Sequence, residues 1–164
     1  GDALAERSFE QGGWGAGLYD WLHRAADVVN RGFSGYRTGW VRSVLPGALG
    51  AASRPILAVV LLFGDCEPEG AGQLDGVEQY AADLGAMISM VRAAAPEAAV
   101  VAITPPDPVG APARVVDLAR RRAAAVRAMP ADAVVDLWDE APIGAAGSRK
   151  LLVLLKRALR RLPG

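Results

Sequence analysis

The feature that most constrains the fold of this chain is an alternation of short, apolar, β-branched runs with longer stretches rich in Ala, Arg and Leu. The run at residues 55–63 is apolar almost throughout, as expected for a strand that is buried on both faces. Strands that alternate with helical stretches usually form a parallel sheet covered by helices. The sequence therefore predicts an α/β fold.

The expected elements follow from this alternation and from the Gly, Pro and Asp residues that punctuate it. Strands are predicted at residues 28–32, 56–64, 99–104 and 133–137. Helices are predicted at residues 15–26, 38–49, 77–95, 112–128 and 148–161. A length of 164 residues suits one domain over residues 1–164, with a Gly-rich surface loop at 67–76.

Composition excludes several classes of partner. The chain has 18 basic and 18 acidic residues and is 52% hydrophobic, which argues against disorder and against a general nucleic-acid binder. A lone cysteine, Cys66, forms no internal disulfide and gives no sign of an oxidising compartment. No apolar run reaches the roughly 18 residues of a membrane helix, and no signal peptide is evident. We expect a cytoplasmic protein with no nucleic-acid partner and no transmembrane segment.

Several motifs lie where predicted strands end. Gly1-Asp2-Ala3-Leu4 opens the chain, and residues 27–38 read Asp-Val-Val-Asn-Arg-Gly-Phe-Ser-Gly-Tyr-Arg-Thr. Further motifs lie at residues 62–65, 103–106 and 134–138. Together they resemble the blocks of GDSL-type SGNH hydrolases, and the second block is most similar to isoamyl-acetate-hydrolysing esterases. The resemblance covers nearly the whole chain and implies a three-layer αβα, flavodoxin-like fold.

The resemblance also implies a catalytic chemistry. In that family a Ser of the Gly-Asp-Ser turn attacks an ester carbonyl, and a His that an Asp orients acts as the base. The Ser amide, a Gly amide and an Asn side chain stabilise the oxyanion. Here Ala3 holds the Ser position, and Gly35 matches the glycine donor. Asp65 directly follows Gly64, without the family's intervening residue and Asn.

The resemblance therefore implies a vestigial site with no catalytic set intact. Its members are Asp2, Ala3, Gly35, Gly64 and Asp65. The family's Asp-x-x-His before the last helix is also absent, and His23, the one histidine, is expected to be structural. Losing nucleophile and base together removes on the order of a millionfold in rate, because triad members act as a unit. We expect an esterase-like domain without catalysis, whose ligand would be a small ester or acyl group.

A further departure concerns the sheet. In the family the first strand precedes the Gly-Asp-Ser turn and lies between the second and third strands, whereas this sequence begins at Gly1. The expected fold therefore lacks that first strand. The alternative is that this chain is an incomplete version of an active esterase.

Other features have a structural interpretation beside a functional one. Cys66 as a substitute nucleophile lacks a nearby histidine, and the carboxylates of Asp65, Glu67 and Glu69 suit a solvated loop better than a metal site. We expect no metal and no cofactor. The tryptophans are expected to pack in the core, and the arginines at 120–122 to form a solvated helix face.

The last predicted helix is amphipathic and basic. Its leucines recur at helical spacing, and its opposite side carries Lys and Arg without any acid. The favoured interpretation is a helix packed on the sheet by its leucines. The alternative is a non-catalytic binding protein that uses this helix on a membrane or a partner. The oligomeric state is not predicted.

Overall fold

The computed structural model describes residues 1–64, 76–138 and 145–162. Its sheet consists of β1 (Ala58–Leu62), β2 (Ala99–Ile103) and β3 (Ala133–Val135), which are parallel and lie in the order β1-β2-β3. The register pairs Leu62 with Ile103 and Ile103 with Val135, so all three strands end at the same edge. The predicted α/β class and parallel sheet are confirmed.

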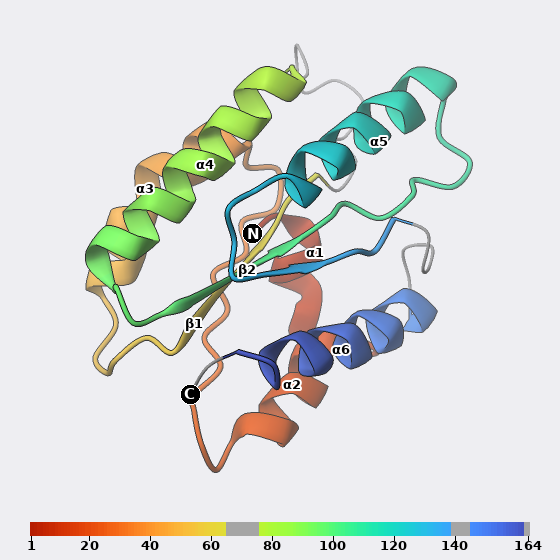
Figure 1. Ribbon diagram of the computed structural model, residues 1–164. Coiled ribbons are helices and arrows are strands. Elements are labelled where there is room, and N and C mark those ends of the chain that lie inside the picture. The colour runs from red at the N-terminus through yellow and green to blue at the C-terminus, as the bar shows by residue number, and fades with distance from the viewer. Residues whose placement is uncertain (65–75, 139–144, 163–164) are drawn as a thin grey trace.

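The helices form layers on both faces of this sheet (Figure 1). They are α1 (Ala3–Glu6), the 3-10 helix η1 (Arg7–Phe9), α2 (Trp14–Leu22), α3 (Thr38–Gly50), α4 (Val77–Ala94), α5 (Ala113–Arg127) and α6 (Ala145–Leu159). Figure 1 shows α3, α4 and α5 on one side of the strands and α2 and α6 on the other. The three-layer arrangement expected from the family resemblance is therefore present.

Two apolar cores explain the layers. Successive side chains of a strand point to opposite faces, and β1 and β2 follow this rule. Leu61, Val100 and Ala102 face the core shared with α3 and α4. Leu62, Val101 and Ile103 face the core shared with α2 and α6. Apolar runs such as 58–62 thus supply both cores at once, as a sheet covered on both faces requires.

The long helices bury stripes at helical spacing. In α4 the buried apolar positions are Tyr80, Leu84, Met87, Ile88 and Val91. In α6 Leu151 and Leu155, four residues apart, are 3% and 0% exposed and pack against the sheet. The favoured interpretation of the last helix, a leucine face packed on the sheet, is confirmed.

The prediction of a strand at residues 28–32 is wrong. This segment has no regular secondary structure, and its hydrogen bonds go to the first residues of the chain instead of to a neighbouring strand. The Phe33 amide donates to Gly1 O at 2.9 Å, and the Asn30 side chain binds the Glu6 carbonyl. On the other side of Gly1, the Asp2 amide donates to Leu62 O, so Gly1 separates this segment from β1.

Two side-chain predictions also need correction. Trp14 and Trp21 pack against the core, but Trp40 is 56% exposed and forms an edge-to-face contact with Tyr36. Arg122 does not belong to a solvated face, since it is only 6% exposed and stacks over the Tyr80 ring. Within the described ranges, no helix is both long and apolar enough to cross a membrane.

Candidate functional site

The first residues of the chain meet the end of β1. The Asp2 amide donates to Leu62 O at 3.1 Å, and the Asp2 carboxylate accepts from the Leu4 amide at 3.2 Å. Asp2 is thus the N-cap of α1, which is why a helix begins directly after it. Ala3 is the first residue of that helix and is half-buried at the carboxyl edge of the sheet.

The segment that leads to Gly35 lies against the same residues. Ser34 donates its amide to the Glu6 carboxylate, and a Cβ on Gly32 would lie 2.0 Å from the Glu6 nitrogen. That approach is possible only for glycine. Gly35 follows in an exposed turn at φ +75°, and no described residue accepts a hydrogen bond from its amide. The structure therefore brings the segment containing Gly35 close to Asp2 and Ala3.

Gly64 completes the described part of the site. Its φ is +101°, and a Cβ there would lie 3.0 Å from the Pro105 Cβ and 3.7 Å from the Tyr80 hydroxyl. Both the backbone conformation and the close approach require glycine at this position. Asp65, the remaining predicted site residue, lies outside the described residues, as do Cys66, Glu67 and Glu69.

Tyr80 is the buried hydroxyl closest to Gly64, and the sequence interpretation did not single it out. It is 2% exposed and donates to Phe63 O at 3.1 Å. Burial raises the pKa of Tyr80; the Arg122 guanidinium, 5.1 Å from its ring, opposes this rise, and the Asp2 charge adds to it. The hydroxyl therefore stays protonated and committed to the backbone, which makes it a structural group rather than a nucleophile.

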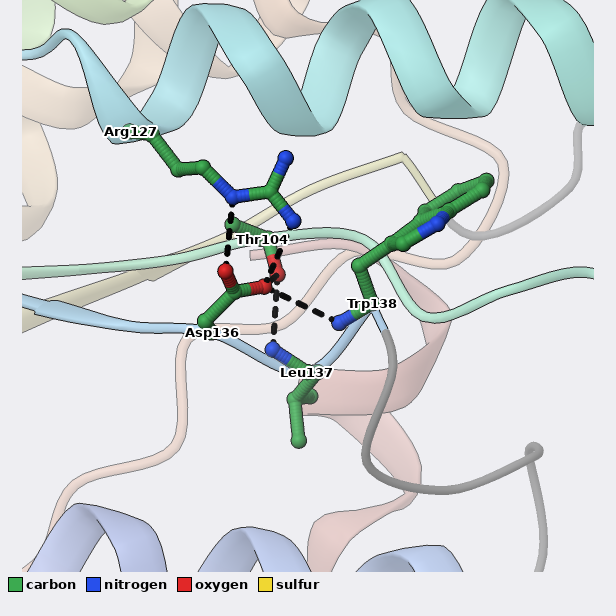
Figure 2. Close-up of polar contacts among 5 residues, drawn as sticks. All are labelled: Thr104, Arg127, Asp136, Leu137 and Trp138. Atoms are coloured by element: carbon green, nitrogen blue, oxygen red, sulfur yellow. Dashed lines mark hydrogen bonds and ion pairs between the residues drawn. The ribbon is translucent and has the colours of Figure 1, made fainter.

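A second polar network closes the ends of β2 and β3 (Figure 2). Thr104 is fully buried, donates its hydroxyl to Asp136 Oδ1 at 3.0 Å and accepts from the Leu137 amide at 2.7 Å. Arg127, at the end of α5, donates to both carboxylate oxygens, and the Trp138 amide donates to Oδ1. Both oxygens of Asp136 are therefore engaged.

The pKa of Asp136 reflects these contacts. Burial alone would raise it, but hydrogen bonds from Arg127, Trp138 and Thr104, together with the Arg127 charge, outweigh burial and lower the pKa below 3.8. A carboxylate held this way is a poor proton acceptor. Thr104 and Asp136 occur in the motifs at 103–106 and 134–138, but nothing in the sequence indicated that they bind one another across neighbouring strands.

The described groups do not assemble a nucleophile and a base. Ser8, the next hydroxyl after Ala3, is 2% exposed in η1, where it accepts from the Asn30 side chain at 3.4 Å. His23 lies exposed at the end of α2, with Nδ1 2.6 Å from Asp20 O, which agrees with a structural role. In the parts of the chain that are described, no three His, Cys, Asp or Glu side chains group as metal ligands.

Fold and site together define a class. A parallel sheet lies between two layers of helices, and glycines with positive φ, Gly35 and Gly64, lie near its carboxyl edge beside the N-terminus of α1. Residues 1–152 match the model of the GDSL-like Lipase/Acylhydrolase family. The chain therefore belongs to this family.

Known relatives agree with this assignment. The isoamyl acetate-hydrolyzing esterase 1 homolog of Bos taurus is 40% identical over an alignment of 113 positions, which covers 65% of this chain and 45% of that protein. Its Homo sapiens counterpart is 41% identical over 112 residues, again 45% of its length. The match thus spans less than half of these relatives. A GDSL esterase/lipase of Arabidopsis thaliana is 34% identical over an alignment of 166 positions, which covers 85% of this chain and 69% of the plant protein.

A solved structure supports the fold. The crystal structure of a possible lipase from Chitinophaga pinensis superposes with a TM-score of 0.54 and 22% identity, covering 85% of this chain and 66% of that one. At this identity the likeness bears on the arrangement of helices and strands alone.

Proposed function

We propose that this chain is an esterase-like domain that has lost hydrolysis and keeps at most the capacity to bind a small ester or acyl group. The observation that carries the proposal is Ala3, a methyl group at the first residue of α1, where the family resemblance expects the nucleophilic hydroxyl. A methyl group cannot attack a carbonyl, and acyl transfer by this family requires a nucleophile activated by a base.

The surroundings of Ala3 support the same conclusion. Ser8 is buried and bonded to Asn30, and His23 is bonded to its own helix, so neither is placed to replace a triad member. Asp136 lies at the correct edge of the sheet, but Arg127 and Thr104 occupy its oxygens. A low-pKa carboxylate in such a network is a structural anchor rather than a general base.

Ligand binding rests on the features that remain. The Gly35 amide is exposed, and Gly64 lets the backbone pass close to Pro105 and Tyr80 at the end of β1. Isoamyl acetate is the substrate named for the mammalian relatives, and we propose short-chain acetate esters as the ligand class here. Binding is read from amide chemical shifts on titration with isoamyl acetate, with changes expected at Gly35 and Gly64. The absence of changes at both would defeat the binding part alone.

The catalytic part is tested with a p-nitrophenyl ester. Purified protein is expected to release no p-nitrophenol from p-nitrophenyl acetate above a heat-inactivated control. Turnover that disappears in Cys66→Ala would show that the thiol acts as the nucleophile and would overturn the proposal.

Restoring the hydroxyl gives a second test. Ala3→Ser is expected to remain inactive, because the base and the Asn donor are still missing; removing one such donor alone typically costs about a hundredfold or more. Ala5→Ser, in the same short helix, is the matched control for adding a hydroxyl. Activity in Ala3→Ser but not in Ala5→Ser would show that a working base exists in the chain.

A further inference from the structure

The outer side of α6 carries a row of cations. Four cations and one valine recur at helical spacing along α6 and into Arg160, the residue that follows it and whose amide still donates to Lys156 O. We call this set the α6 stripe: Arg149, Val153, Lys156, Arg157 and Arg160. All are exposed except Lys156, which is half-buried. The stripe spans 11 residue steps, or about 17 Å at the helical rise.

The stripe is separate from the apolar face that anchors α6. Leu151 and Leu155 are buried against the sheet, while Val153, between them in sequence, is 53% exposed. Figure 1 shows α6 in the layer with α2, on the side of the sheet away from α3, α4 and α5. The leucines of α6 therefore pack in the core, and its basic side faces the surface.

The segment that carries the stripe is rich in basic residues. Residues 145–162 contain six Lys or Arg and no Asp or Glu, so the remaining chain has 12 basic against 18 acidic residues. Among the described residues, no acidic side chain pairs with any cation of the stripe. By contrast, Arg42 and Arg127 lie 2.9 and 2.6 Å from Asp83 and Asp136. A neutral protein with such a local excess attracts a polyanion at that surface.

The Trp21 ring lies beneath two cations of the stripe and adds apolar surface to it. Its ring, half-buried on α2, lies 5.8 Å from the Lys156 ammonium and 5.4 Å from the Arg160 guanidinium carbon. Cations held over an indole ring, next to an exposed valine, combine charge with apolar surface. This combination suits the boundary between lipid headgroups and acyl chains.

We propose that the α6 stripe binds the surface of an anionic phospholipid bilayer. A flat row of cations on one helix, with Val153 and Trp21 among them, fits such a surface better than a nucleic-acid groove or an acidic peptide. Clusters of about four to eight Lys or Arg on an amphipathic helix are typical of binding to anionic phospholipid. The proposal does not depend on whether the domain hydrolyses esters.

The test uses sedimentation with vesicles of phosphatidylcholine alone or with added phosphatidylserine. The protein is expected to sediment only with the phosphatidylserine vesicles, and 1 M salt should release it because salt screens exposed charges. The triple variant Arg149→Gln, Arg157→Gln, Arg160→Gln is expected to bind roughly a hundredfold more weakly, from about 1 kcal/mol per removed charge.

A matched control removes the same charge from the other face of the molecule. Arg114, Arg120 and Arg121 are exposed on α5, and the triple change of these residues to Gln should leave vesicle binding almost unchanged. Equal weakening by both triples would overturn the proposal, as would equal sedimentation with uncharged vesicles. Circular dichroism of each variant verifies folding. Tighter binding of the stripe to duplex DNA or polyglutamate than to the anionic vesicles would also overturn it.

Discussion

Replacing Thr104 with Val tests the network at the ends of β2 and β3. The change keeps the β-branched shape but removes a hydroxyl that is fully buried and makes two hydrogen bonds. Leu137 is 4% exposed, so its amide would lose its acceptor without gaining water. Asp136 would lose one donor and keep Arg127 and the Trp138 amide.

The magnitude follows from these contacts. Leaving a buried donor unpaired costs about 1–3 kcal/mol, while the lost bond to Asp136 adds less because that carboxylate keeps other donors. We expect Thr104→Val to lower the free energy of unfolding by about 2 kcal/mol. For a chain of this length that corresponds to a fall of about 4–8 °C in melting temperature.

The assay is urea unfolding followed by circular dichroism, with amide hydrogen exchange at Leu137 as a local measurement. Thr104→Ser is the control, since it keeps both hydrogen bonds and loses only a methyl group, at about 1 kcal/mol. Leu137 should exchange faster in the Val variant and not in the Ser variant. If Thr104→Val proved at least as stable as Thr104→Ser, with Leu137 still protected, the reasoning about this network would be refuted.

Three further predictions concern stability. The pKa of Asp136 lies below its ordinary 3.8 in the folded state. The ionised carboxylate therefore stabilises the fold above pH 3.8, and this stabilisation is lost as the pH falls through the lower folded-state pKa. Asp136→Asn should remove this part of the acid dependence of urea unfolding. Gly64→Ala should cost about 2 kcal/mol in the same assay, since φ is +101° and Pro105 lies 3.0 Å from the new Cβ; stability equal to the parent would contradict this account. Asp83→Asn should cost about 1–3 kcal/mol, because the buried carboxylate binds Thr38 and Arg42, whereas Asp117→Asn, at an exposed pair, should change stability by less than about 0.5 kcal/mol.

The spacing of apolar residues, together with the Gly, Pro and Asp residues between them, predicted most of the helices and strands. The helix predicted at 77–95 is α4 at Val77–Ala94, and the strand predicted at 99–104 is β2 at Ala99–Ile103. These elements bury apolar side chains at a regular spacing, and that spacing is visible in the sequence itself. The segment at 28–32 shares only a Val-Val pair with these strands and forms no strand. Strand formation depends on a partner beside the segment, and here Gly1 and α1 take its hydrogen bonds.

Two positions of the candidate site have a backbone conformation that the glycines in the sequence make possible. Gly64 and Gly35 follow motifs in which glycine is needed, and both have positive φ. The partners of Thr104, Asp136 and Arg127 were not predictable, because they lie on different elements that only the folded sheet brings together. The burial of Arg122 was not predictable for the same reason. Its neighbours Arg120 and Arg121 are exposed, and only packing against Tyr80 distinguishes Arg122 from them.

The stability of the α6 stripe variant separates binding from folding. Lys156 and Arg160 are four residues apart, and removing one of two like charges at that spacing stabilises a helix by about 0.2–0.5 kcal/mol. Cations near a helix C-terminus contribute about 0.3–1 kcal/mol in the opposite sense, and the contact of Arg160 with the Trp21 ring adds about 0.5–1 kcal/mol, so the net loss should be about 1 kcal/mol. If these arginines served the fold, their removal would lower stability by more than this and leave vesicle binding unchanged. If they serve a lipid surface, binding falls while the loss of stability in urea unfolding stays within this limit, and Thr104→Val shows the reverse pattern because it alters the interior and no surface charge.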